Sequence, residues 1–136
     1  MNFMLKGYSD SDCDTCEEDK NHYQMIIKSG YPSLTTIPGG NVAGTSFIVS
    51  TITLNTSGLS NPCIRIDFTS NVVSTDFDET IIFQVFKHYN NLSCPVSPIW
   101  TFSPTTSLAT TVSFFAWDCD YCNNQYCTYI VVATIQ

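Results

Sequence analysis

Apolar and polar residues alternate with the two-residue period of β-strands along most of the chain that follows Tyr23. The stretch Thr45 to Asn55 (TSFIVSTITLN) shows this alternation best, and its Thr, Val and Ile residues suit a pleated sheet surface. Turn residues such as Pro38-Gly39-Gly40 separate the alternating segments. Eight strands are predicted: Tyr23–Lys28, Ser33–Ile37, Thr45–Asn55, Cys63–Phe68, Thr80–Lys87, Ile99–Phe102, Thr110–Trp117 and Tyr126–Ile135.

No segment has the period of a convincing helix, so the predicted fold class is all-β. Eight strands at this spacing are typical of a two-sheet sandwich, a jelly roll or a small barrel, and their number favours a jelly-roll β-sandwich. The last predicted strand runs almost to residue 136. A terminal strand leaves a sheet edge that invites pairing with another chain.

Residues 1–23 have no sustained period and are predicted to form a flexible N-terminal connector arm, followed by the jelly-roll domain over residues 24–136. Fully extended at about 3.3 Å per residue, such an arm would reach roughly 75 Å. It contains the acidic stretch Asp10 to Asp19, with Cys13 and Cys16 three positions apart. We therefore ask what a cysteine-bearing arm does in front of a compact β domain.

Composition narrows the classes of partner. Of 136 residues, 43% are hydrophobic and only 12% are charged, so the surface is rich in Thr, Ser and Asn and repels copies of itself weakly. The net charge is −7, and five Lys and Arg residues are too few for nucleic acid or for anionic membranes. No apolar run approaches the ~18 residues of a membrane span, and no signal peptide is expected.

Seven cysteines are a high count for an intracellular protein, and their number is odd. In a disulfide scaffold, Cys119 and Cys127 bracket a tight connection and are candidates to staple the last two strands. Cys13 and Cys16 suit disulfides to an adjacent subunit, because folding the arm back loses entropy without a visible gain. The core or acceptor cysteines are Cys63, Cys94, Cys119, Cys122 and Cys127.

A metal site is the alternative use of these thiols. The Cys13/Cys16 and Cys119/Cys122 pairs have the spacing of two zinc knuckles, which together give four thiolates. The two halves are ~100 residues apart, whereas compact zinc ribbons separate them by about 15 to 20. Thiol–disulfide catalysis is disfavoured because the surrounding carboxylates raise the pKa of the arm thiols. The arm also begins like a calcium loop at Asp10, but Thr15 replaces the required glycine.

No other motif indicates chemistry. The sequence contains no nucleophile elbow, no phosphate-binding glycine loop and no His-Glu-x-x-His, so the chain is not expected to be an enzyme or to need a cofactor. Several aromatic residues are either core or a ligand platform: Trp100, Phe102, Phe114, Phe115 and Trp117. A carbohydrate-binding module is therefore kept as an alternative.

From about residue 25 onward the chain resembles an uncharacterised clostridial domain family. The resembling stretches are Ile26–Gly30 (IIKSG), Asn61–Ser70 (NPCIRIDFTS), Phe83–Lys87 (FQVFK), Trp100–Ser103 (WTFS) and Phe114–Cys122 (FFAWDCDYC). The resemblance covers about 110 residues, and the family implies no activity.

A second resemblance is architectural. A jelly roll of this size without a signal peptide, preceded by a cysteine-bearing arm, is similar to the endospore-appendage pilus subunits of Bacillus. The resemblance implies that Cys13 and Cys16 link each subunit to its neighbours and that core cysteines accept them. It also implies release by lysis of the mother cell. The chain departs from those subunits in having Cys-x-x-Cys rather than adjacent cysteines.

These observations predict a structural subunit that assembles with itself into an extracellular or spore-surface fibre, a helical homopolymer locked by disulfides. The alternatives are a non-polymerising spore-surface or carbohydrate-binding module, and a zinc protein with ligands Cys13, Cys16, Cys119 and Cys122.

Overall fold

The computed structural model describes residues 2–7, 24–89, 91–104, 107–120 and 126–136, with the backbone alone described for residues 2–7 and 24. Every regular element in this part of the chain is a β-strand, which confirms the predicted all-β class. The described residues contain no helix, and hence none long enough to cross a membrane.

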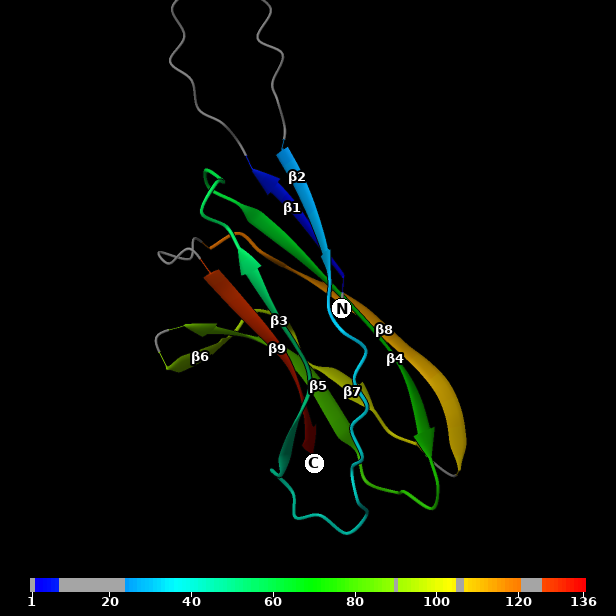
Figure 1. Ribbon diagram of the computed structural model, residues 1–136. Helices are drawn as coiled ribbons and strands as arrows, with labels where there is room; N and C mark the ends of the chain where they lie inside the picture. The colour runs from blue at the N-terminus through cyan, green and yellow to red at the C-terminus, as the bar shows by residue number, and fades with distance from the viewer. Residues whose placement is uncertain (1, 8–23, 90, 105–106, 121–125) are drawn as a thin grey trace, which may run out of the picture.

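The strands form two antiparallel sheets (Figure 1). One sheet has the order β2-β1-β4-β8, and the other has the order β3-β9-β5-β6, with β7 also pairing with β5. The strand bounds are β1 Asn2–Gly7, β2 Gln24–Ser29, β3 Ser46–Asn55, β4 Cys63–Ser74, β5 Ile81–Tyr89, β6 Leu92–Pro95, β7 Trp100–Phe102, β8 Leu108–Asp118 and β9 Tyr126–Ile135.

The two sheets pack face to face through the side chains that the alternation placed inward. Phe68 of β4 lies 6.3 Å from Phe83 of β5 between ring centroids, and Trp100 of β7 stacks at 4.0 Å on Phe114 of β8. Burying each large apolar side chain stabilises the fold by roughly 1.5–3 kcal/mol. The core cluster is Ile52, Leu54, Leu59, Ile64, Ile66, Phe68, Phe77, Ile81, Phe83, Val85, Phe114, Ala116, Cys127, Tyr129, Val131, Ala133 and Ile135.

A β-bulge explains why β3 has no single inward face. The register of β3 with β9 shifts between Ile48 and Ser50. Before the shift, Phe47 and Val49 pack against the core, and after it the inward positions are those of Ser50, Ile52 and Leu54. One extra residue in a strand exchanges the two faces beyond it, which period-two reasoning cannot anticipate.

The prediction of a strand over Ser33–Ile37 is wrong. This segment lies outside both sheets, and among the described residues no backbone–backbone hydrogen bond reaches residues 31–37. It is held to β3 by the Ser33 hydroxyl, which donates to the Val49 carbonyl at 2.8 Å. The segment has the Thr and Ile content of a strand, but its backbone forms no ladder with the neighbouring β3.

The prediction that residues 1–23 form an arm needs correction at its start. Residues Asn2–Gly7 form strand β1, which pairs antiparallel with β2 on one side and β4 on the other. The six-residue segment is too short to show a period in the sequence, and its pairing depends on strands far along the chain. Residues 8–23, including Cys13 and Cys16, lie outside the described residues.

Candidate functional site

The disulfide of the described chain ties together the ends of two paired strands. Cys63 begins β4 and Cys119 directly follows β8, and these strands pair antiparallel with Ile64 opposite Asp118. The register therefore brings the two cysteines side by side, and they form a disulfide. The predicted Cys119–Cys127 disulfide is wrong, because Cys119 is bonded to Cys63. The pairing of β4 with β8 decides the partner of Cys119, rather than closeness along the chain.

The other cysteines of the described chain differ in accessibility. Cys127 is 1% exposed within β9 and is also held in a disulfide. Cys94 is exposed on the short strand β6 and is the free thiol among the described residues. It is therefore the described cysteine that a second molecule can reach.

Cys13, Cys16 and Cys122 lie outside the described residues, so their predicted roles stay predictions. Within the described residues, no group of three or more His, Cys, Asp or Glu side chains is arranged to hold a metal ion. Cys119 cannot serve as a thiolate ligand while it is bonded to Cys63. The four-thiolate zinc site would therefore require that bridge to be reduced.

A buried polar cluster joins the two sheets next to this disulfide. The Lys87 ammonium lies 2.7 Å from the Asp118 carboxylate, and the Tyr129 hydroxyl donates to the same carboxylate at 2.6 Å. Asp118 ends β8 in one sheet, whereas Lys87 and Tyr129 are opposite each other on β5 and β9 of the other. The Asp118 and Lys87 side chains are only 2% and 11% exposed.

The cluster is completed by backbone groups of the chain just after β8. The Asp120 N–H donates to Asp118 at 3.0 Å, and Lys87 donates to the Asp120 carbonyl at 2.8 Å. A buried charge is tolerated when it is paired and hydrogen-bonded in this way. The cluster therefore holds the end of β8, and with it Cys119, against the opposite sheet.

The environment of Tyr129 suppresses its ionisation. Burial, the hydrogen bond to Asp118, and the negative charges of Asp118 and Asp120 raise the pKa of the Tyr129 phenol well above its ordinary value of about 10. Tyr129 therefore acts as a neutral hydrogen-bond donor. It stabilises the carboxylate and has no role as a base at neutral pH.

Sequence reasoning missed this cluster although the alternation pointed to it. Lys87 follows Ile81, Phe83 and Val85 on the inward face of β5. Asp118 likewise follows Phe114 and Ala116 on the inward face of β8. A charged residue at an inward position on each of two strands is the signal that would have suggested a buried ion pair.

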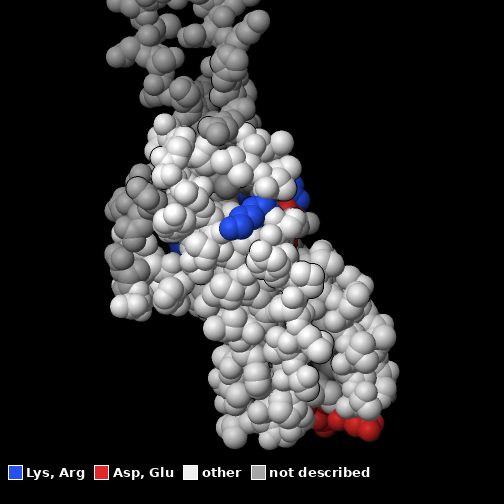
Figure 2. All heavy atoms as spheres, in the orientation of Figure 1, with Lys and Arg blue, Asp and Glu red and all other residues white. Residues whose placement is uncertain are grey.

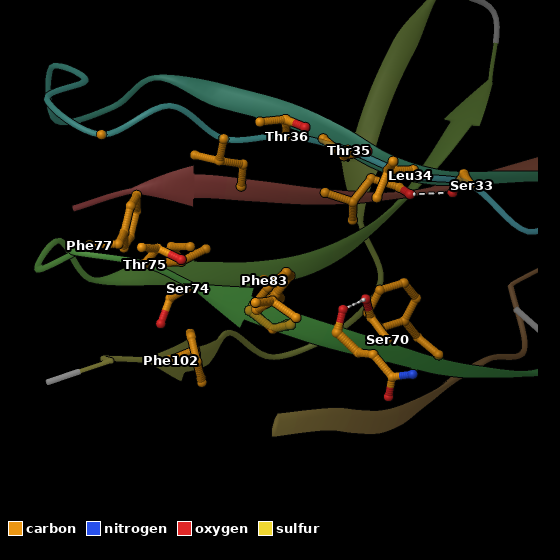
Figure 3. Close-up of a pocket in the computed structure, with 18 residues that line it drawn as sticks. Ser33, Leu34, Thr35, Thr36, Ser70, Ser74, Thr75, Phe77, Phe83 and Phe102 are labelled. Atoms are coloured by element: carbon orange, nitrogen blue, oxygen red, sulfur yellow. Dashed lines mark hydrogen bonds between the residues drawn. The ribbon is translucent and has the colours of Figure 1, made fainter. Parts of the chain in front are cut away.

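At the other end of β4 the sandwich contains a cavity of about 350 Å³ (Figure 3). Its wall combines the segment around Leu34 with residues of β4 and with aromatic side chains such as Phe77, Phe83 and Phe102. Ser33, Ser70 and Ser74 add hydroxyls, and no lining side chain is ionisable near neutral pH. The cavity offers apolar contacts and neutral hydrogen bonds, so it suits binding rather than acid–base chemistry.

The aromatic residues that the sequence singled out divide into two groups. Phe114 is buried, and Trp100 and Phe102 pack partly buried against the core. Phe115 and Trp117 are instead 55% and 47% exposed on the outer face of β8. The Arg65 guanidinium lies 4.9 Å from the centre of the Phe115 ring and 5.9 Å from that of Trp117.

The edge strands of the β2-β1-β4-β8 sheet both carry exposed apolar side chains. On β2, Met25, Ile26 and Ile27 are 55%, 36% and 63% exposed in succession. On β8, the opposite edge, the exposed Phe115 and Trp117 extend the apolar surface. Unpaired backbone groups beside apolar side chains form a template for another strand.

Within the described residues these features define a disulfide-tied β-sandwich whose one sheet exposes apolar side chains on both edge strands. The chain belongs to the family described as a domain of unknown function, DUF4489, which it matches over residues 23–136. The expectation of an uncharacterised domain family over the β domain is thus confirmed. No curated protein and no solved structure matches the chain.

We expect Lys87→Met to lower the free energy of unfolding by about 3–5 kcal/mol, because it leaves the buried Asp118 carboxylate without its cation. Chemical denaturation at pH 7 measures the change. Lys28→Met is the matched control, since Lys28 is exposed and its hydrogen bond to the Thr53 carbonyl is a surface contact. We expect it to cost no more than about 1 kcal/mol. Equal losses in the two variants would show that the buried pair of Lys87 with Asp118 contributes no more to the free energy of unfolding than a surface contact does.

The raised pKa of Tyr129 predicts a distinct alkaline behaviour. Its contribution to stability is complete below pH 10 and is lost as the pH rises further, because the unfolded phenol ionises near 10 and the folded one does not. We expect wild-type stability to fall above pH 10 by about 1.4 kcal/mol per pH unit more than that of Tyr129→Phe.

Denaturant titrations between pH 8 and 11 measure that slope. Tyr126→Phe is the control, because Tyr126 is 57% exposed and its removal should leave the slope unchanged. If the free energy of unfolding depends on pH in the same way for wild type and Tyr129→Phe, the raised pKa of Tyr129 is contradicted.

Proposed function

We propose that this protein is a structural subunit that assembles with itself into an extracellular fibre of the endospore-appendage kind. The observation that carries the proposal is the pair of apolar edges on one sheet. The exposed β2 edge of one copy and the exposed β8 edge of the next supply complementary rows of backbone donors and acceptors. Because the two edges differ, the contact is head-to-tail and leads to an open filament rather than a closed dimer.

The surface charge supports close packing of copies. Only 12% of residues are charged, and the described part of the face in Figure 2 is almost entirely uncharged, with a few Lys or Arg and Asp or Glu atoms near its middle and further Asp or Glu atoms at its lower tip. Coulomb repulsion between such faces is small. Neighbouring subunits can therefore approach along this face without burying many unpaired charges.

Disulfides would make the polymer durable. Cys13 and Cys16 are the proposed linkers, and the exposed Cys94 is the described thiol best placed to accept one of them. The Cys63–Cys119 bridge supports an oxidising location such as the extracellular space or the spore surface, because cytosolic proteins rarely keep structural disulfides. A clostridial, spore-borne origin belongs to the same proposal.

The proposed jelly-roll topology fits the strand order. Successive strands alternate between the sheets from β2 to β5, and β8 and β9 again lie in different sheets. This winding supports a jelly roll, in which the chain repeatedly crosses from one layer to the other. It leaves β2 and β3 as neighbours in sequence on different sheets, each at an edge.

Electrophoresis in hot detergent, with and without reductant, tests the fibre directly. We expect unreduced protein to run as a ladder or stay in the well, and to collapse to a 15.2 kDa band on reduction. The variant Cys13→Ser/Cys16→Ser should fold but give polymers that dissociate in boiling detergent without reductant. Electron microscopy of the same samples shows whether the polymers are fibres.

Cys94→Ser is the companion variant, and it should lose the same linkage if Cys94 is an acceptor. A variant fibre without arm cysteines that survives boiling detergent would contradict the linkage. A single monomer band in both lanes, with four thiols protected from alkylation until a chelator is added, would instead support the zinc protein.

The exposed pair Phe115 and Trp117 favours a second candidate, a non-polymerising spore-surface or carbohydrate-binding module. Flat aromatic side chains with a guanidinium beside them are able to stack on a sugar ring and hydrogen-bond its hydroxyls. For this candidate we expect retention on a glycan array that Trp117→Ala abolishes. Tyr126→Ala, which removes an exposed aromatic from a different strand, should leave retention intact. Equal binding by both variants would remove the aromatic pair from consideration.

A further inference from the structure

Strand β1 occupies a slot in the middle of its sheet, although it comes from the first residues of the chain. It pairs with β2 from Asn2 opposite Ser29 to Gly7 opposite Gln24. It pairs with β4 from Asn2 opposite Asp67 to Lys6 opposite Cys63. Within the described sheet β2 has no other strand partner. Without an inserted strand, β2 would be detached and β4 would have an open edge.

The connection from β1 to β2 is much longer than the pairing requires. Paired antiparallel strands need a loop of about two to five residues. Here residues 8–23, sixteen in all, separate Gly7 from Gln24. A chain of that length spans at most roughly 56 Å. A domain of 136 residues has a radius of gyration of about 14 Å, so the connection can reach beyond its own domain.

The family match covers the two strands on either side of β1 but not β1 itself. The match begins at residue 23, so it includes β2 and β4 but not β1. The matched domain therefore has a gap in one sheet that a strand from outside its span must fill. Nothing in the pairing itself requires the strand to come from the same molecule, because the backbone hydrogen bonds are the same in either case.

We propose that in the assembled protein the slot between β2 and β4 is filled by residues 2–7 of a neighbouring copy. This inference rests on the proposed fibre and adds a second non-covalent link to the lateral pairing of β2 with β8. Each subunit gives its β1 to one neighbour and receives β1 from another, which makes the contact head-to-tail and open. The inserted strand gains hydrogen bonds along both of its edges, whereas lateral pairing of β2 with β8 gains them along one.

The proposed exchange also explains where the arm cysteines are placed in the sequence. The end of β1 at Lys6 is opposite Cys63, which is bonded to Cys119. Cys13 and Cys16 follow Lys6 by seven and ten residues. A donated strand thus brings its arm cysteines to the accepting subunit, at the end of the sandwich where the described disulfide lies.

Cysteine cross-linking between different chains tests the exchange. Met4, Ile27 and Arg65 occupy matching register positions on β1, β2 and β4, and the Ile27 side chain is 63% exposed. Two single variants, Met4→Cys and Ile27→Cys, are prepared in a background in which Cys13, Cys16 and Cys94 are replaced by Ser, and the background alone, oxidised in the same way, is the blank. Circular dichroism first confirms that each variant folds.

The two variants are mixed, assembled and oxidised, and we expect a linked pair of about 30 kDa, twice the chain mass. Met25→Cys replaces Ile27→Cys in the control, because Met25 is equally accessible on the same strand but two residues out of register. This offset of about 6.6 Å along the strand makes the pair diagonal, so its Cβ atoms lie about 7–8 Å apart rather than about 5 Å, and roughly tenfold less product is expected.

Two results would overturn the exchange. In one, the mixed single variants stay monomeric while the double variant Met4→Cys/Ile27→Cys forms a bridge within one chain, so each molecule fills its own slot. In the other, neither preparation cross-links, so β1 does not occupy the slot. Electron microscopy separates this outcome from the fibre itself: fibres without cross-links leave the proposed function standing, and cross-linked pairs without fibres establish exchange but reject the fibre.

Discussion

The constraint on which this structure depends is that backbone donors and acceptors along a strand need partners on both sides or contact with water. In the interior of the sheets the need is met: β9 lies between β3 and β5, and β1 lies between β2 and β4. At the β2 edge of the described sheet the backbone groups on one side are left to water, and the exposed apolar side chains of Met25 and Ile27 lie beside them. Soluble proteins usually protect such edges with charge, proline or bulges. The β2 edge carries one such charge, Lys28, beside the exposed apolar side chains of Met25, Ile26 and Ile27, and a partner strand along this edge would remove those apolar side chains from water.

Period-two alternation was sufficient to predict the class and most strands. The last strand was located to the residue, from Tyr126 to Ile135, because a polar loop is followed by a run rich in aromatic and β-branched residues. Alternation failed where a strand needs a neighbour. Ser33–Ile37 has the composition of a strand but lies outside both sheets, and β6 (Leu92–Pro95) is exposed throughout and exists through its pairing with β5.

The parts of the candidate site that escaped prediction all depend on register. The partner of Cys119 follows from the antiparallel pairing of β4 and β8, which no local spacing encodes. The meeting of Lys87 with Asp118 similarly requires the two sheets to be superposed. The alternation along β5 and β8 puts both side chains on the inward faces of their strands. Which charges meet across the sandwich is decided by tertiary packing. From the sequence alone, the cysteines were therefore singled out without their correct partners, and Lys87 and Asp118 were not singled out.

The two ends of β4 are held by different contacts. At Cys63 a disulfide and the ion pair of Lys87 with Asp118 join β4, β8 and the opposite sheet. Near Ser74 the same strand lines a cavity closed on one side by a segment without ladder hydrogen bonds. Tension applied through an inserted β1 would be transmitted along β4 and β2 by shear of parallel rows of hydrogen bonds. The Cys63–Cys119 bridge lies at the end of β4 that pairs with Lys6. A force applied through the connection after Gly7 would reach the sheet at this end. Reinforcement at the point of load is what a subunit of a durable fibre requires, and a freely soluble binding module has no such need.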